Sequence, residues 1–200
     1  MKFFKKKSAP AAEIKLAPPG AGIPAWEEAV LRYIVLPIWY KSYHWERALA
    51  YFQEQGAIIL EMYRKIDPAK ATQRVLIPRT LALEDSSRNW SAAMVLEHLA
   101  IVDRAVIGIL QSLAAGKAPD AVASTAAVKP KGEWSAIEAD QKFFQTIIDY
   151  SRAAKLANMN KEPRYRHPWF GALPAHGWHV FTSLHHQIHR KQLEEIIKRL

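Results

Sequence analysis

Two histidines one helical turn apart near the C-terminus, His185 and His189, have the spacing in this chain that most directly indicates chemistry. On a helix the i, i+4 spacing stacks two imidazoles on one face, so that both rings can reach one metal ion. Both lie inside an apolar arc, where an unsatisfied buried polar group costs about 1 to 3 kcal/mol. Coordination of a divalent metal ion would satisfy both rings at once.

A third histidine, His98, interrupts a second apolar stripe in the same way. Glu97, Arg104 and Gln111 are expected to face away from that stripe. The stripe itself consists of Met94, Val95, Ile101, Val102, Ala105, Val106 and Ile109. We therefore predict a metal site built from His98, His185 and His189. Gln192, one turn beyond His189 on the same arc, is the candidate for an outer group that orients a ligand, or it hydrogen-bonds a buried backbone group.

Each of these signals alone is weak. A single histidine on an apolar stripe is usually a hydrogen-bonded core residue, and an HxxxH pair arises by chance in a histidine-rich segment. This segment also contains His167, His176, His179 and His186, of which His179 and His186 are expected nearer the edge of the arc. The convergence of inward histidines from two separate helices is what favours a ligand role.

Four long helices are expected to position these side chains. Ser91 is a suitable N-cap, Ser135 and Glu138 fit a capping box, Gly116 can end a helix, and Pro174 suits a first turn. The expected helices cover residues 45–66, with a short preceding helix from Trp26 interrupted around Pro37, and residues 91–115, 135–156 and 174–200.

The connections 67–90, 117–134 and 157–173 are long for a bundle, so they either line a pocket or cover the surface. The connection 117–134 is long enough for the second and third helices to run parallel. We predict an all-α four-helix bundle over residues 25–200, with long loops and a flexible lead over residues 1–24 that is rich in Lys, Pro and Ala.

The amino-acid composition excludes several kinds of chemistry and gives the chain a basic charge. The 200 residues include no cysteine, which excludes disulfides, thiolate ligands and a cysteine nucleophile, so any thiol must be supplied from outside. The net charge is +9, and five lysines lie in the first twenty residues. No secretory signal and no membrane span are expected, because the basic start lacks an apolar run and residues 29–40 fall short of about 20 apolar residues. A cytoplasmic protein is the expectation.

Two segments resemble the DinB superfamily, a group of four-helix proteins that includes YfiT-like metal hydrolases and thiol-dependent transferases. One is Asn89-Trp-Ser-Ala-Ala-Met-Val-Leu-Glu-His98-Leu-Ala. The other is His167-Pro-Trp-Phe-Gly171, followed by Trp178 and by His185-His-Gln-Ile-His189-Arg-Lys-Gln192-Leu. The likeness covers roughly residues 40–200, and it implies the same three histidine ligands. The basic lead, and Pro174 in place of a threonine-like cap, depart from the family pattern.

The expected function is a metal-dependent transferase or hydrolase in which zinc, nickel or iron activates a small thiol or water against a small electrophile. One alternative is a non-enzymatic metal-binding or interaction bundle, and another is a nucleic-acid or anionic-membrane binder acting through the basic lead. Nucleic-acid binding is the least favoured, and the aromatic-rich first helix could serve a homodimer. Tyr43, His44 and Trp45 either face the pocket or pack, and packing is favoured.

Overall fold

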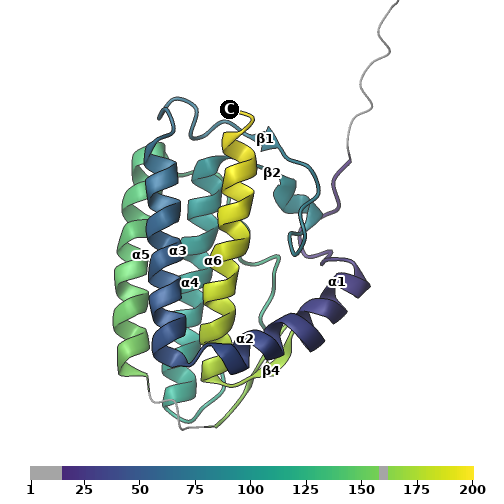
Figure 1. Cartoon of the computed structure of the whole chain (residues 1–200), viewed down its shortest axis with the longest axis vertical. Coiled ribbons are helices and arrows are strands. Elements are labelled where there is room, and N and C mark those ends of the chain that lie inside the picture. Colours follow the sequence, from purple (N-terminus) through teal and green to yellow (C-terminus); the bar gives the residue numbers. More distant parts are fainter. Residues whose placement is uncertain (1–14, 158–161) are drawn as a thin grey trace, which may run out of the picture.

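A computed structural model describes residues 15–157 and 162–200 as a bundle of long helices with a helical arm at one side (Figure 1). The bundle helices are α3 (Trp45–Arg64), α4 (Ala92–Ala114), α5 (Ala136–Leu156) and α6 (Ala175–Ile197). All four segments expected from the sequence therefore form, and the predicted all-α four-helix bundle is confirmed. None of the described helices is long and apolar enough to cross a membrane.

The bundle has two parallel helix pairs. Helix α3 runs parallel to α6, α4 runs parallel to α5, and the two pairs are antiparallel to each other. Between α3 and α6, Trp45 contacts His179 and Phe52 contacts His186. Between α4 and α6, Asp103 contacts His186 and His98 contacts His189, and Glu97 near the start of α4 binds Gly132 just before α5. The connection after α4 therefore returns along the helix before α5 begins, as the loop length allowed.

Local sequence signals explain the helix boundaries. The Ser91 hydroxyl accepts a hydrogen bond from the Met94 backbone N–H at 3.1 Å and so caps α4. Ser135 and Glu138 form the predicted capping box of α5. Pro174 is the N-cap of α6 and not a residue of its first turn. These caps set where α4 and α6 start, and hence the phase of the histidines on each helix.

The arm consists of α1 (Ala25–Val30), a π-helical turn (Leu31–Val35) and α2 (Leu36–Ser42). The helical path continues through Pro37, where an interruption was expected, and it breaks at Tyr43 and His44. A proline is tolerated in the first turn of a helix, where its missing N–H costs least, and Pro37 lies at the start of α2 directly after the π turn.

Two short hairpins lie in the long connections. Strand β1 (Val75–Leu76) pairs with β2 (Asn89–Trp90), and β3 (Tyr165–His167) pairs with β4 (Gly171–Leu173), both antiparallel. A 3-10 turn, η2 (Asp85–Arg88), precedes β2. The sequence pattern did not predict these strands, because two or three residues show no measurable alternation.

Residues 15–24 contact the connection between α3 and α4. The Ala17 N–H donates to the Asp85 carboxylate at 2.8 Å, and the Gly20 N–H lies 3.4 Å from a carboxylate oxygen of Glu84. The rest of the predicted lead, residues 1–14, lies outside the described residues.

Candidate metal centre and adjoining cavity

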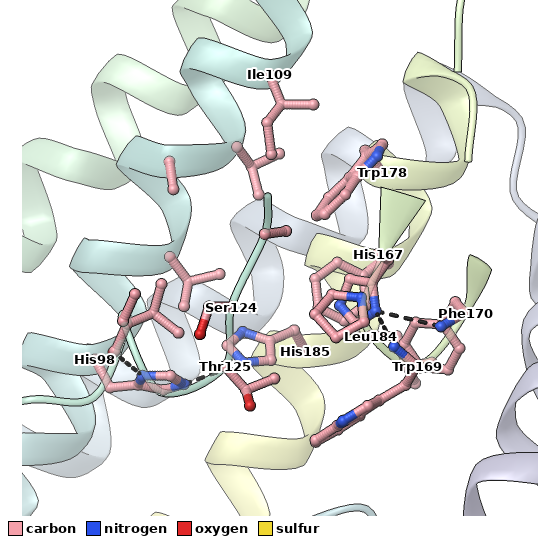
Figure 2. A pocket seen from close by; sticks show the side chains of 18 of the residues that line it. His98, Ile109, Ser124, Thr125, His167, Trp169, Phe170, Trp178, Leu184 and His185 are labelled. Atoms are coloured by element: carbon pink, nitrogen blue, oxygen red, sulfur yellow. Dashed lines mark hydrogen bonds between the residues drawn. The ribbon is translucent and has the colours of Figure 1, made fainter. Parts of the chain in front are cut away.

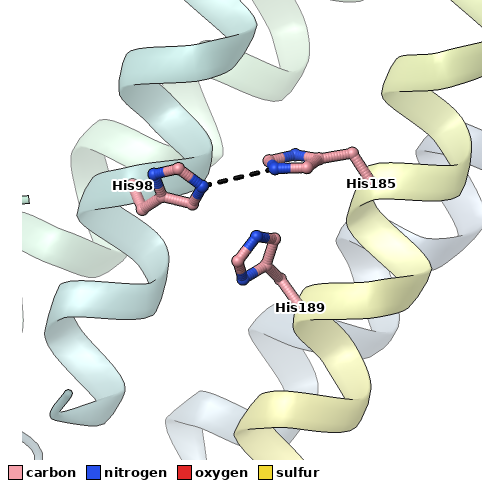
Figure 3. A group of neighbouring side chains, drawn as sticks. All are labelled: His98, His185 and His189. Carbon is pink, nitrogen blue, oxygen red and sulfur yellow. Dashed lines mark hydrogen bonds between the residues drawn. The ribbon is translucent and has the colours of Figure 1, made fainter. Parts of the chain in front are cut away.

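Three imidazoles from two helices meet in the bundle: His98 from α4, and His185 and His189 from successive turns of α6 (Figure 3). One ring nitrogen of each lies within 4.8 Å of the other two, and Nε2 of His98 is 3.3 Å from Nε2 of His185. Ligand nitrogens about 2.0 to 2.1 Å from a tetrahedral metal ion lie roughly 3.3 to 3.4 Å apart. The spacing of the His98 and His185 nitrogens therefore suits a shared ion.

Hydrogen bonds fix the tautomers of two of these rings. Nδ1 of His98 lies 2.8 Å from the Val128 carbonyl oxygen, and Nδ1 of His189 lies 2.6 Å from Oε1 of Gln192. Both partners are acceptors, so each Nδ1 carries the proton and each Nε2 keeps a free lone pair. Gln192 in turn donates to the Ser87 carbonyl at 2.7 Å, which sets the orientation of its amide.

His185 is the least satisfied of the three rings. Its Nδ1 is buried and has no hydrogen-bond partner in the described part of the chain. Its Nε2 faces Nε2 of His98, which already presents a lone pair. As its Nε2–H tautomer, His185 would donate to His98 at 3.3 Å, whereas as its Nδ1–H tautomer it would share a cation with His98 through one Nε2 lone pair from each ring.

Burial keeps this cluster neutral. Removal from water lowers the pKa of His98 to about 4, despite its hydrogen bond to Val128. Burial, followed by repulsion from the neighbouring imidazoles, also places the pKa of His185 and of His189 well below the usual value. All three rings are therefore unprotonated at neutral pH, the state in which imidazole binds a metal ion.

The helical wheel placed three side chains wrongly, two on α6 and one on α4. His179 and His186 are fully buried in the bundle interior and do not lie at the edge of the arc, because α3 and α5 cover that side of α6. Glu97 is also buried, since the backbone N–H groups of Lys131 and Gly132 donate to its carboxylate at 3.0 and 2.9 Å. The wheel could not include the crossover segment that folds over α4.

A cavity of about 390 Å³ adjoins the histidine cluster (Figure 2). Helices α4 and α6 form two of its walls, and the arm contributes Leu31. The remaining walls come from residues 82–87, residues 119–129 and the β3–β4 hairpin, so all three long connections line a pocket, which was one of the two roles considered for them. His98, His185 and His189 all belong to the lining.

His167 opens the second motif of the resemblance, but the sequence analysis assigned it no role in the site. It closes β3, is 5 % exposed and lies with His185 on the cavity wall. Burial lowers its pKa to about 3. Its position before Pro168 in a turn was visible in the sequence, but the pairing of β3 with β4 that brings it against α6 was not.

The residues before and at the start of α3 do not line this cavity. The Trp45 indole is buried and donates to the Ala154 carbonyl at 3.0 Å, Tyr43 stacks on Trp39, and the side chain of His44 is 71 % exposed. The favoured interpretation, ordinary packing, is thus the one that fits Trp45 and Tyr43.

Comparison with known proteins supports the fold alone. A solved structure described as TT2238, a four-helix bundle protein, matches with a TM-score of 0.56 and 20 % sequence identity, over 76 % of this chain and 98 % of that one. No protein-family model matches this chain, and no curated protein matches it. The resemblance to the DinB superfamily therefore rests on the sequence motifs.

Proposed function

We propose that this protein is a metal-dependent enzyme of the DinB type, in which His98, His185 and His189 hold a divalent cation beside a substrate cavity. The observation that carries the proposal is the convergence of three neutral imidazoles on a cavity wall, within 4.8 Å of one another. The donor set fits the ion, because His98 and His189 present Nε2 lone pairs and Nε2 of His185 lies 3.3 Å from that of His98.

A divalent ion held by three neutral imidazoles keeps its full charge and an open position, and can activate water or hold a thiol as thiolate. The protein orients the ligands and keeps water from the site. Val128 and Gln192 fix the rings of His98 and His189, and the apolar cavity walls exclude water. With no cysteine in the chain, a low-molecular-weight thiol would come from outside. The reaction is then a transfer or hydrolysis on a small electrophile, and imidazole ligands suit zinc, nickel or iron.

The cavity favours an enzyme over a closed metal-binding protein. A structural metal site fills all its coordination positions with protein ligands and needs no space beside the ion. Here all three candidate ligands border a cavity whose size lies in the range of small-molecule sites, roughly 300 to 1,000 Å³.

Metal analysis of protein purified without a histidine tag tests the site. We expect about one equivalent of a divalent metal per chain, and less than about a tenth of an equivalent in His98→Ala. The exposed His44 provides the matched control, since His44→Ala should retain the metal. An untagged wild-type protein with under a tenth of an equivalent, or a His98→Ala variant with undiminished metal, would overturn the proposal.

The enzymatic part has its own test. Metal-loaded wild-type protein should consume an α,β-unsaturated ketone in the presence of a small thiol, or hydrolyse an activated ester, and His98→Ala should lose that activity along with the metal. A fully loaded protein that is inactive with both substrate classes would favour the non-enzymatic alternative.

A further inference from the structure

The lining of the cavity is mainly apolar. On α4 it includes Val102, Val106 and Ile109, and on α6 it includes Phe181, Leu184 and Ile188. A ligand inside must exchange water for these surfaces, which favours apolar groups by about 25 cal/mol for each Å² buried. Most of the occupant should therefore be hydrocarbon.

The charged side chains of the lining neutralise each other. Nζ of Lys129 lies 2.5 Å from a carboxylate oxygen of Glu84, donates to the Ser87 hydroxyl at 2.8 Å and stands over the Trp90 ring. Among the described lining residues, Lys129 is the sole lysine or arginine and Glu84 the sole carboxylate. A charged ligand would lose its hydration here without gaining an unpaired partner from the protein.

His167 is a lining residue whose tautomer is fixed by the turn that follows it. Its Nδ1 accepts from the backbone N–H groups of Trp169 and Phe170 at 3.1 and 3.3 Å (Figure 2). Nδ1 therefore holds the lone pair, and in the neutral ring the proton lies on Nε2. No described residue accepts a hydrogen bond from that Nε2–H.

Packing holds the His167 ring in place. The ring centroids of Phe181, Phe170 and Trp178 lie 4.4, 4.7 and 5.1 Å from that of His167. A donor fixed by a turn on one side and aromatic rings around it loses little freedom when it binds an acceptor, so it can orient a ligand.

We propose that the cavity binds an uncharged, mainly apolar molecule carrying an oxygen acceptor, and that His167 donates its Nε2–H to that oxygen. This deepens the proposed function by naming the substrate class of the same site, and it places the acceptor beside the wall that His185 shares. Binding itself requires no metal, so it can be measured when the metal site is empty.

The experiment uses the full chain in excess chelator with the uncharged dye N-phenylnaphthylamine as the reporter. Three competitors of matched shape displace it: para-butylacetophenone, para-butylcumene, in which isopropyl replaces acetyl, and para-butylbenzoate. We expect the ketone to bind about fivefold more tightly than the hydrocarbon, the equivalent of a hydrogen bond of about 1 kcal/mol. The benzoate should bind at least about tenfold more weakly than the ketone.

Two variants separate the donor from the turn. In His167→Asn the amide oxygen can still accept from Trp169 and Phe170, but no donor reaches the Nε2 position. In His167→Phe the ring shape remains and both nitrogens are lost. Both variants should lose the preference for the ketone while their affinity for the hydrocarbon stays within about twofold, whereas His44→Asn should behave as wild type.

The inference is overturned if the ketone preference persists in both His167 variants, if the benzoate binds as well as the ketone, or if none of the competitors displaces the dye. Because chelator is present throughout, none of these results depends on the metal. A protein that fails the metal analysis can still pass this test, and the reverse also holds.

Discussion

Helix α6 carries buried histidines toward two different neighbours, and the two sets differ in how their nitrogens are satisfied. On the bundle side, His179 accepts from the Tyr150 hydroxyl at 2.8 Å and donates to the Trp45 carbonyl at 3.1 Å. On the cavity side, His185 and His189 direct nitrogens at His98 and at each other. Helical spacing is shared by both sets, and His185 and His186 each have an unpartnered Nδ1. What distinguishes the candidate ligands is therefore the convergence of three ring nitrogens on one point, whereas His186 meets the Asp103 carboxylate.

The largest expected effect separates the two sets by metal-dependent stability. With free zinc or nickel at about a thousand times its Kd, the metal should stabilise wild-type protein by about 4 kcal/mol, because it binds the folded state alone. His185→Ala should lose this increment, whereas His179→Gln should keep it although its metal-free stability is lower. Urea denaturation with and without metal gives the increment for each protein. If both variants lost the metal-dependent stabilisation equally, the two sides of α6 would not differ in metal binding.

The second effect concerns His186, which also belongs to the bundle side. Its Nε2 lies 2.9 Å from the Asp103 carboxylate, and both side chains are fully buried. Asp103→Ala leaves that nitrogen in the core without a partner and opens a small cavity, which should lower the free energy of unfolding by about 3 kcal/mol. Asp149 on α5, whose side chain is 44 % exposed, is the control, where alanine should cost under about 0.5 kcal/mol.

The loss at Asp103 should be the same with and without metal. If Asp103→Ala instead removed bound metal and left the metal-free stability unchanged, the Asp103–His186 pair would belong to the site and not to the scaffold. Metal analysis of the variant, alongside its urea denaturation curve, distinguishes these results.

The helices were predictable because their signals are local. The Ser135–Glu138 capping box, the Ser91 cap and the 3.6-residue periodicity each act within a few residues of chain, and the structure reproduces them. The convergence of His98 with the α6 pair also followed from helical phase, and geometry brings these rings together as expected.

The side-chain positions that the sequence did not predict depend on contacts between segments distant along the chain. His167 reaches the cavity through a three-residue pairing of β3 with β4, and Glu97 is buried by residues 131 and 132. Likewise, the side of α6 that carries His186 could not be placed in the core without knowing that α3 and α5 cover it. A helical wheel gives the phase of a helix but not the number of neighbours around it.

The pH dependence of stability offers a third comparison, at the bundle-side His179. Burial lowers its pKa to about 4, from about 6.5 in the unfolded chain, so the unfolded state binds more protons below pH 6.5. Stability therefore falls as the pH decreases, and His179 should contribute a loss of about 1.5 kcal/mol between pH 6.5 and pH 5.

His179→Gln should remove this contribution from the pH profile of urea denaturation, measured in chelator. The exposed His44 has no such role, and His44→Gln should leave the profile unchanged. A profile for His179→Gln as steep as that of wild type would show that the proton uptake belongs to other groups.

The smallest expected effect tests how the cavity-side set is held in place. Gln192 accepts from Nδ1 of His189 at 2.6 Å and donates to the Ser87 carbonyl at 2.7 Å, so it ties this imidazole to the loop before β2. Gln192→Leu keeps the approximate volume but removes both bonds, and it should weaken metal binding about tenfold, or about 1.4 kcal/mol. Gln187→Leu, on the same helix and outside the cavity lining, should leave the affinity unchanged. Equal affinities for the two leucine variants, in a competition titration against a metal-sensitive dye, would mean that packing alone orients His189.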